Sequence, residues 1–290
     1  MTDAPLRALV TGANGQLGKA LAAAAPAGTA LRCLTHADLD IAEPAAVEIA
    51  LREFSPNLVL NAAAFTAVDE AERTPATAQR VNSQGPAVLA AACARVGAWL
   101  THVSTDYVFD GAQNRPYETS APARPLSVYG RTKLEGETAA MRELPQAATV
   151  VRASWLYSAH GGFAARVLTL MQSRPQLSIV ADQIGVPTSA SGLAQVLWSI
   201  SARRTAGLWH WCDSGVASWY DFAVAIGELA VELKLLRTAP PITPIASTEY
   251  PTAAARPPYS VLDKRATEKL LGITAPHWRG ALRATLGELV

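Results

Sequence analysis

The first half of the chain alternates between short apolar runs and longer segments in which apolar residues recur at helical spacing. The apolar runs are predicted strands and cover residues 6–10, 30–34, 57–61, 98–103 and 149–153. The predicted helices cover residues 16–25, 44–54, 68–96 and 127–141, with a break expected at Gly85-Pro86. Continuous apolar runs are typical of strands that are buried on both faces. The alternation therefore predicts an α/β fold with a doubly wound parallel sheet.

The second half of the chain loses this alternation. Proline pairs at 240–241 and 257–258 interrupt it, and Trp209, Trp211 and Trp219 gather in one stretch. We therefore expect a Rossmann-type domain over residues 1–155 and mainly a smaller substrate-binding lobe over residues 156–290. The two parts are interleaved, because segments near 180–205 and 240–250 are expected to return to the first domain. The polar segment 111–125 is predicted to be a loop over the strand ends, where open parallel sheets bind ligands.

Charge and composition narrow the function classes. The 25 basic and 24 acidic residues nearly cancel and form no basic stripe, which argues against a nucleic-acid partner. No apolar stretch approaches the roughly 18 to 20 residues that span a bilayer, so we expect no membrane partner. Residues 1–5 are too short and acidic for a signal peptide, and the three separated cysteines are typical of reduced thiols. We expect a cytoplasmic protein, and the histidine spacing predicts no catalytic metal.

Three glycines directly follow the first predicted strand and lead into the first helix. They are Gly12, Gly15 and Gly18, in the spacing G-x-x-G-x-x-G, with Gln16 and Leu17 before the third glycine. Glycines permit a tight turn, and the free N–H groups at a helix N-terminus bind a pyrophosphate. An ordinary strand-to-helix turn is the alternative. Both flanking elements are those that a dinucleotide site requires, so we favour such a site.

The end of the second strand bears on the choice of nicotinamide cofactor. Sites for NAD usually place an acid about 20 residues after the glycine turn, whereas this chain has Thr35-His36 there. A 2′-phosphate is then not repelled, and His36 or Arg32 is placed to contact it. We expect NADPH, with NADH tolerated. Asp40 and Ile41 are predicted near the adenine, although a charge ahead of the helix at Pro44 is the alternative for Asp40.

Tyr129 and Lys133 are the candidate catalytic pair. Residues four apart on a helix share one face, and an ammonium beside a phenol lowers the phenol pKa. Such a phenol is a proton donor that works near neutral pH. Ser104-Thr105-Asp106 closes the fourth strand, where the Thr105 hydroxyl would stabilise a carbonyl oxygen that receives hydride. The alternative is that these three residues only cap the next turn. The combination indicates a nicotinamide-dependent reductase.

Several longer segments match one pattern. They are residues 11–18, 61–72, 81–82, 104–111, 129–133, 152–157 and 182–188, with 219–222 and 255–257 late in the chain. Together they resemble the dTDP-4-dehydrorhamnose reductases of the extended short-chain dehydrogenase/reductase superfamily, from about Ala8 to the C-terminus. The glycine turn and Tyr-x-x-x-Lys occur throughout the superfamily. Ser-Thr-Asp-Tyr-Val-Phe and Asp-Gln-x-Gly-x-Pro-Thr are much narrower.

The resemblance implies a reaction. Hydride from NADPH would reduce C4 of dTDP-4-dehydro-6-deoxy-L-mannose and yield dTDP-L-rhamnose, the last step of its synthesis. Tyr129 would supply the proton, Lys133 would lower the Tyr129 pKa and hold the nicotinamide ribose, and Thr105 would orient the carbonyl. The other implied cofactor contacts are Gly12, Gly15, Gln16, Leu17, Gly18, Ala63, Ala64, Phe65 and Thr66.

The resemblance also implies substrate contacts. Asp106 and Trp155 join Thr105 at the sugar nucleotide, although an aromatic residue after a strand is more often part of the core. Arg256 is placed to bind a diphosphate bidentately, and its alternative is a solvent-exposed arginine in a proline-rich loop. Asn82 is expected to bond backbone near the active site, since a buried polar residue needs a partner.

One departure from the family concerns magnesium. Some members bind it at a dimer interface through carboxylates, one of which comes from the first helix. This chain has Lys19 at that position and no acid in residues 189–192. We therefore expect no magnesium and a monomer or weak homodimer. Two alternatives stay open: a reductase of another nucleotide 4-keto-6-deoxy sugar, and a non-catalytic cofactor-binding subunit, like the β subunit of methionine adenosyltransferase, which has this fold.

Overall fold

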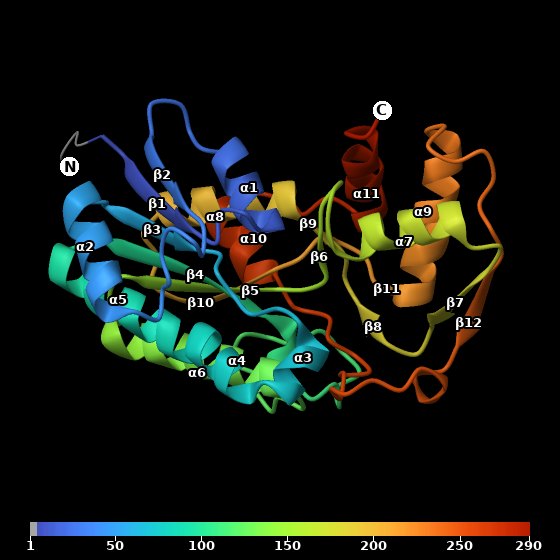
Figure 1. Cartoon of the computed structure of the whole chain (residues 1–290), viewed down its shortest axis with the longest axis horizontal. Coiled ribbons are helices and arrows are strands. Elements are labelled where there is room, and N and C mark those ends of the chain that lie inside the picture. Colours follow the sequence, from blue (N-terminus) through green and yellow to red (C-terminus); the bar gives the residue numbers. More distant parts are fainter. Residues whose placement is uncertain (1–4) are drawn as a thin grey trace.

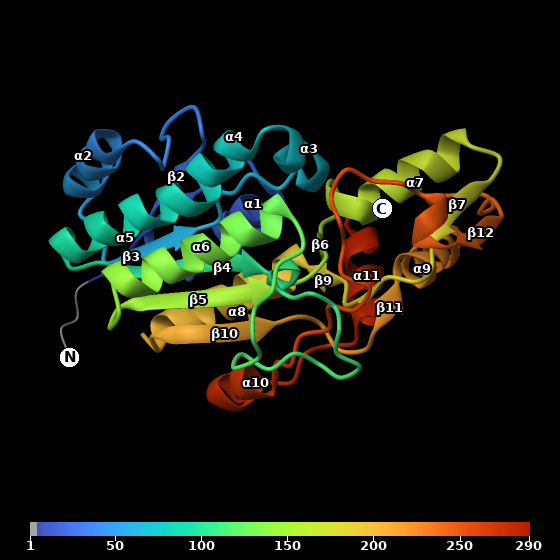
Figure 2. The ribbon, with the colours of Figure 1, turned by 90° about the horizontal axis from the view of Figure 1, so that it is seen from below.

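The centre of the protein is a six-stranded parallel sheet. A computed structural model describes residues 5–290, so the signal-peptide expectation for residues 1–5 falls almost entirely outside it. The strand order is β10-β5-β4-β3-β1-β2. The strands are β1 (Arg7–Thr11), β2 (Ala30–Leu34), β3 (Leu58–Asn61), β4 (Trp99–Thr105), β5 (Ala148–Ala153) and β10 (Gly207–Trp211). Helices lie on both sides of this sheet (Figures 1 and 2), which confirms the predicted doubly wound fold.

Each face of the sheet has its own hydrophobic core. Helices α1 (Gln16–Ala23), α8 (Ala190–Ala202) and α10 (Arg265–Leu271) pack on one face, and α2 (Pro44–Phe54), α5 (Gly85–Val96) and α6 (Val128–Glu143) pack on the other. Successive strand residues point to opposite faces, so Val10 of β1 lies in the first core and Leu9 in the second. Burial on both faces explains why the strands are continuous apolar runs.

The position of the ligand crevice follows from the strand order. β1 lies between β2 and β3, so the chain moves outward in one direction after β1 and in the other after β2. Open α/β sheets bind ligands at the carboxyl ends of the strands where this direction switches. The glycine turn after β1 and residues 62–66 after β3 therefore share one crevice.

The helical segment after β3 is divided differently from the prediction. It consists of α3 (Val68–Arg73), α4 (Pro75–Gln79), a π-helical turn η1 (Arg80–Gln84) and α5. The break expected at Gly85-Pro86 is wrong, because the axis breaks at Thr74, just before Pro75. Pro86 fits in the first turn of α5 because the preceding turn is wide, with the Gly85 N–H donating to the Arg80 carbonyl.

The second lobe lies to the right in Figure 1 and is built around α7 (Gly162–Ser173), α9 (Trp219–Glu232) and α11 (Trp278–Gly287). Three two-stranded pairs complete it: β7 (Leu177–Val180) with β12 (Ile242–Ile245), β8 (Ile184–Gly185) with β11 (Ala217–Ser218), and β6 (Leu156–Tyr157) with β9 (Thr188–Ser189). None of the helices in residues 5–290 combines the length and the apolar character needed to span a bilayer.

Two segments of the second half differ from the expected interleaving. Strand β12 pairs with β7 and packs Ile242 on the lobe core, so the expected return of residues 240–250 to the Rossmann domain is wrong. Conversely, Trp209 and Trp211 belong to β10 at the edge of the main sheet rather than to the lobe. Helix α8, within the segment 180–205, packs against α1 on the main sheet.

Candidate active site

The turn after β1 brings bare backbone to the crevice. Gly12 has φ +69°, and a Cβ on it would lie 2.6 Å from the Ala63 nitrogen. A Cβ on Gly18 would lie 2.3 Å from the Gly12 carbonyl oxygen, so helix and turn are in direct contact. Helix α1 begins after Gly15 without a side-chain cap, which leaves its first N–H groups for an anion. This geometry fits the pyrophosphate of a dinucleotide.

The two residues after Gly15 have different surroundings. The Leu17 side chain is buried in the core, so only its backbone is available to a ligand. The Gln16 side chain crosses to the second lobe, where its Oε1 accepts a hydrogen bond from the Ser158 hydroxyl at 3.1 Å. A Cβ on Gly161 would lie 2.7 Å from the Gln16 side chain. Gln16 therefore links the glycine turn to the lobe, a role that its position in the sequence does not indicate.

Residues 62–66 are fixed beside the glycine turn by two buried asparagines. Asn61 Oδ1 accepts hydrogen bonds from the Thr11 hydroxyl at 2.7 Å and from the Ala63 N–H at 3.2 Å. Asn82 brackets Phe65: its Oδ1 accepts from the Phe65 N–H at 2.8 Å, and its Nδ2 donates to the Phe65 carbonyl at 3.0 Å. The expectation that Asn82 bonds backbone near the site is confirmed. Ala64 is half-buried and Thr66 exposed, both at the crevice.

The residues predicted near the adenine are held by the protein itself. Asp40 pairs with Arg80 and accepts a hydrogen bond from the Ala42 N–H at 3.0 Å, ahead of α2. Ile41 is 3% exposed and packs on Gly85, so its side chain has no surface left for a base. Arg32 lies 3.6 Å from Glu53. Direct cofactor contact by these residues stays a prediction.

Helix α6 is pressed against the end of β4. The Ser127 hydroxyl caps it by accepting from the Gly130 N–H at 3.1 Å. A Cβ on Gly130 would lie 2.1 Å from the Tyr107 carbonyl oxygen, in the short helix η2 (Asp106–Val108) that follows β4. The rings of Tyr107 and Tyr129 meet edge to face with centroids 5.8 Å apart. The absence of a side chain at position 130 thus allows Tyr129 to reach the end of β4, where Thr105 lies.

The pKa values of the catalytic pair differ from the expectation. Burial raises the pKa of Tyr129 to about 12, which the Thr105 side chain partly opposes and the Asp106 carboxylate reinforces. The Lys133 Nζ donates to the Val103 carbonyl at 2.6 Å, no hydrogen bond joins it to the Tyr129 phenol, and it is not among the causes of the Tyr129 pKa shift. The expected lowering of the Tyr129 pKa by Lys133 is therefore wrong in this structure. Tyr129 is a neutral phenol at neutral pH, the protonation state that a proton donor needs.

The Lys133 side chain is itself almost fully buried. It is 2% exposed, and burial lowers its pKa to about 8 while the Glu137 carboxylate opposes that decrease. Glu137 is held in turn by a buried bidentate pair with Arg152, at 2.9 and 2.7 Å. Sequence reasoning missed this pair. The available signal was the position of Glu137, one helical turn after Lys133.

A buried histidine, His102, also faces Lys133. The Asn61 Nδ2 group donates to His102 Nδ1 at 2.9 Å, since the oxygen of the same amide is already occupied by Thr11 and Ala63. Burial, and then the Lys133 ammonium, hold the pKa of His102 well below its ordinary value, so the ring is neutral. Because His102 is neutral, Lys133 is the positively charged member of this pair.

The Thr105 hydroxyl can donate one hydrogen bond, and it donates that bond to Asp106. Thr105 Oγ1 donates to Asp106 Oδ1 at 3.1 Å and accepts from the Tyr107 N–H at 3.2 Å. The capping role of this segment is therefore present, and the Thr105 hydroxyl also lies beside Tyr129, while its contact with a substrate carbonyl stays a prediction. Asp106 is 2% exposed and its Oδ2 has no partner among residues 5–290. Burial raises the pKa of its carboxyl to about 7, and the nearby Ser260 and Thr105 hydroxyls partly oppose that rise.

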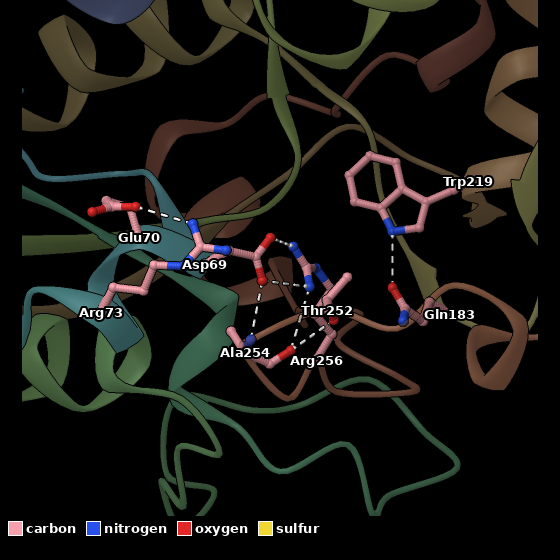
Figure 3. A network of polar contacts seen from close by, with 8 residues as sticks. All are labelled: Asp69, Glu70, Arg73, Gln183, Trp219, Thr252, Ala254 and Arg256. Atoms are coloured by element: carbon pink, nitrogen blue, oxygen red, sulfur yellow. Dashed lines mark hydrogen bonds and ion pairs between the residues drawn. The ribbon is translucent and has the colours of Figure 1, made fainter.

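Two stacked tryptophans, Trp155 and Trp219, lie where the chain passes from β5 into the second lobe. The Trp155 ring stacks on Trp219 with centroids 3.5 Å apart and planes within 3°. Trp155 has φ +44°, a conformation that a bulky residue adopts only under constraint. A Cβ on Gly185 would lie 2.5 Å from the Trp155 ring, and the Trp219 Nε1–H donates to Gln183 at 3.2 Å (Figure 3). Trp155 is partly exposed, so it is not simply a core residue.

Arg256 approaches the same region from the C-terminal half of the chain. Its guanidinium forms an ion pair with Asp69 of α3 at 2.7 Å, and it contacts the side chain of Tyr107. Arg256 is therefore not the free arginine of an exposed loop. The structure brings Thr105, Asp106, Tyr129 and Lys133 together and places Arg256 beside them through Tyr107.

Known proteins share both the sequence and the fold. A family model described as the RmlD substrate binding domain matches residues 6–290. A dTDP-4-dehydrorhamnose reductase of Aggregatibacter actinomycetemcomitans is 38% identical over 286 residues, which cover 96% of this chain and 97% of that protein. The spore coat polysaccharide biosynthesis protein SpsK of Bacillus subtilis is 39% identical over 285 residues, which cover 97% of each. The crystal structure of the Bacillus anthracis dTDP-4-dehydrorhamnose reductase in complex with NADP has a TM-score of 0.93 at 32% identity, covering 98% of this chain and 100% of that one.

Proposed function

The chain belongs to the family of dTDP-4-dehydrorhamnose reductases with the RmlD substrate binding domain, and on this premise we propose that it reduces the C4 keto group of dTDP-4-dehydro-6-deoxy-L-mannose. The family makes it an NAD(P)H-dependent oxidoreductase. The product would be dTDP-L-rhamnose, and the reaction the last step of its synthesis. The observation that carries this proposal is the meeting of Thr105, Tyr129 and Lys133 at the crevice that also holds the glycine turn.

Tyr129 is the proposed proton donor. It is a neutral phenol at the end of β4, and it would protonate the alkoxide that forms when hydride reaches C4. Thr105 lies beside it and would orient the carbonyl oxygen, but its proton is directed at Asp106. The hydroxyl must therefore rotate, or Asp106 must carry a proton, before Thr105 can donate to substrate. Lys133 would hold the cofactor ribose with the N–H donors that Val103 does not use.

NADPH is the proposed hydride source. The NADP complex of the Bacillus anthracis relative supports NADP as the bound form, and the glycine turn fits its pyrophosphate. Gly12, Gly15, Gln16, Leu17, Gly18 and residues 63–66 would line it, mainly through backbone. Tolerance of NADH, independence from magnesium, a monomeric or weakly dimeric state and a cytoplasmic location stay predictions. Lys19 is exposed on α1.

The test is oxidation of the reduced nicotinamide, followed by absorbance. Purified protein would receive NADPH, EDTA and enzymatically generated dTDP-4-dehydro-6-deoxy-L-mannose, and we expect stoichiometric oxidation with dTDP-L-rhamnose as product. Oxidation that appears only after magnesium is restored would contradict the metal prediction alone. Tight NADPH binding without oxidation would favour the alternatives, another 4-keto-6-deoxy sugar or a non-catalytic subunit. A panel of nucleotide keto-sugars then separates those two.

A further inference from the structure

Arg256 is held by a residue that lies 187 positions away in the chain. Figure 3 shows the guanidinium facing the carboxylate of Asp69, which belongs to the first turn of α3. Arg256 Nη2 donates to Asp69 Oδ2 at 2.7 Å, and Nη1 donates to Asp69 Oδ1 at 3.3 Å. The pair is therefore bidentate. It joins the Rossmann domain to the segment that enters the site from the lobe.

Asp69 holds the backbone of that segment as well. Its Oδ1 also accepts a hydrogen bond from the Ala254 N–H at 3.0 Å. The segment continues through Pro258, which lies so close to Gly111 that a Cβ there would be 2.4 Å away. Beyond it, the Ser260 N–H donates to the Ile184 carbonyl at 2.9 Å. Arg256 thus projects from a strap that is anchored on both sides of its own position.

The hydrogen bonds of Arg256 leave one edge of the guanidinium available. A guanidinium has five N–H donors in a planar fork. Asp69 engages one on each Nη, and Nη1 also donates to the Ala254 carbonyl at 3.3 Å. The Nε–H and the second Nη2–H form the remaining edge. Among residues 5–290 no carboxylate or carbonyl accepts from this edge, and the Tyr107 side chain is a further contact of the guanidinium. Two parallel donors of this kind match the oxygens of a phosphate.

We infer that Asp69 is a positioning residue for the diphosphate of the nucleotide sugar, because it fixes one edge of Arg256 and presents the other to the phosphate oxygens. The inference rests on the proposed function, which places a nucleoside diphosphate in this crevice. Arg256 also contacts the side chain of Tyr107, whose ring packs on Tyr129, so a phosphate on its open edge lies near the reacting centre. A bound orientation that is prepared in advance lowers the entropic cost of binding.

The Asp69 carboxylate also has an opposite effect on diphosphate binding. Whether binding becomes weaker or tighter without this charge therefore shows which effect dominates. A negative charge beside Arg256 weakens its attraction for a dianionic diphosphate. Positioning therefore predicts weaker binding when the charge is removed, and simple charge competition predicts tighter binding. Asp69→Asn separates the two, because its Oδ1 still accepts from Ala254 while its amide N–H groups face the Nη2 of Arg256. The strap keeps its anchor, while Arg256 loses the shorter of its two bonds to Asp69 and with it the bidentate pairing that fixes its orientation.

The experiment is calorimetric titration of the full-length, NADPH-loaded protein with dTDP and, separately, with thymidine, which has no phosphate. We expect Arg256→Ala to weaken dTDP binding by roughly tenfold or more and Asp69→Asn by roughly three- to tenfold, as for loss of a charged hydrogen bond. Thymidine affinity should not change in either variant. In turnover, Asp69→Asn should raise KM for the keto-sugar and leave kcat within about twofold. Glu70→Gln is the matched control, since Glu70 pairs outward with Arg73 at 3.1 Å.

A double variant decides whether Asp69 acts through Arg256. If it does, Asp69→Asn has no further effect on dTDP binding in the Arg256→Ala background. An additive effect, or unchanged or tighter dTDP binding by Asp69→Asn alone, overturns the inference. An equal loss of NADPH and dTDP affinity together with a lower Tm would mean that Asp69 is only structural, and also overturns it. Unchanged dTDP binding by Arg256→Ala removes the phosphate assignment, while continued NADPH oxidation leaves the reductase function in place.

Discussion

Replacing Asp106 by asparagine should make the protein progressively more stable relative to wild type as the pH rises from about 4 to about 7. The carboxyl is 2% exposed, one oxygen has no partner among residues 5–290, and no cation pairs with it there. Ionising it without a counter-charge is costly, so burial raises its pKa from an ordinary 3.8 to about 7. The other ionisable groups that face it are the phenols of Tyr107 and Tyr129 and the Cys212 thiol. None of them is a cation.

The sign and the size of the stability change follow from the difference between the Asp106 pKa in the unfolded protein and in the folded protein. The stability contributed by the neutral carboxyl is fully present below pH 3.8 and is lost as the pH rises to about 7. At about 1.4 kcal/mol per pKa unit, the loss is on the order of 4 kcal/mol as an upper bound. The asparagine side chain of the Asp106→Asn variant does not ionise, so the variant escapes the loss. A pH-independent offset from the amide itself is expected in addition, since one amide N–H group remains unpaired.

The assay is the difference in Tm between variant and wild type across pH 4.5 to 8.5. For a chain of this size about 1 kcal/mol corresponds to roughly 2 to 4 °C, so the difference should grow by several degrees toward alkaline pH. Asp110→Asn is the control that should show no such trend. Hydrogen bonds from the Ala112 N–H and the Tyr117 hydroxyl outweigh burial and lower the Asp110 pKa below 3.8, so the stability that this carboxylate contributes changes only below the pH range of the assay and the Tm difference should stay constant. A Tm difference between Asp106→Asn and wild type that does not change with pH would show that the Asp106 carboxyl is solvated or neutralised. That result would refute the argument.

The remaining predictions concern the catalytic pair and the glycine turn. Tyr129→Phe should lower kcat by on the order of a hundredfold or more with NADPH affinity nearly unchanged, and surviving turnover would mean that Tyr129 is not the acid. Lys133→Ala should weaken both NADPH binding and turnover, and because burial lowers the Lys133 pKa to about 8, wild-type NADPH affinity should fall as the pH rises past that value. Unchanged fluorescence titrations with NADPH would contradict a ribose contact. Gly18→Ala should weaken NADPH binding by roughly tenfold or more in the same titration, because its Cβ would lie 2.3 Å from the Gly12 carbonyl. Normal affinity would mean that the turn relaxes without loss.

Several features of the site were predictable because they depend on local pattern. Apolar runs of strand length alternating with helical spacing are sufficient for a doubly wound sheet, and that sheet brings the ends of β1, β3 and β4 to one edge. The glycines after β1 and the spacing of Tyr129 and Lys133 can be interpreted without distant contacts. The buried amide of Asn82 also had to bond backbone, as it does with Phe65.

Other features needed the folded chain, because they depend on burial or on contacts between distant residues. Burial, which no local pattern reports, determines the pKa values of Tyr129, Lys133 and Asp106. The pairing of β12 with β7 depends on the lobe core, and the sequence near 240–250 offers no periodicity that excludes the main sheet. The contact between Asp69 and Arg256 joins residues 187 positions apart. The sequence by itself therefore determined the sheet, the glycine turn and the residues proposed to react, and the tertiary structure alone decided their protonation and the side chains that orient them.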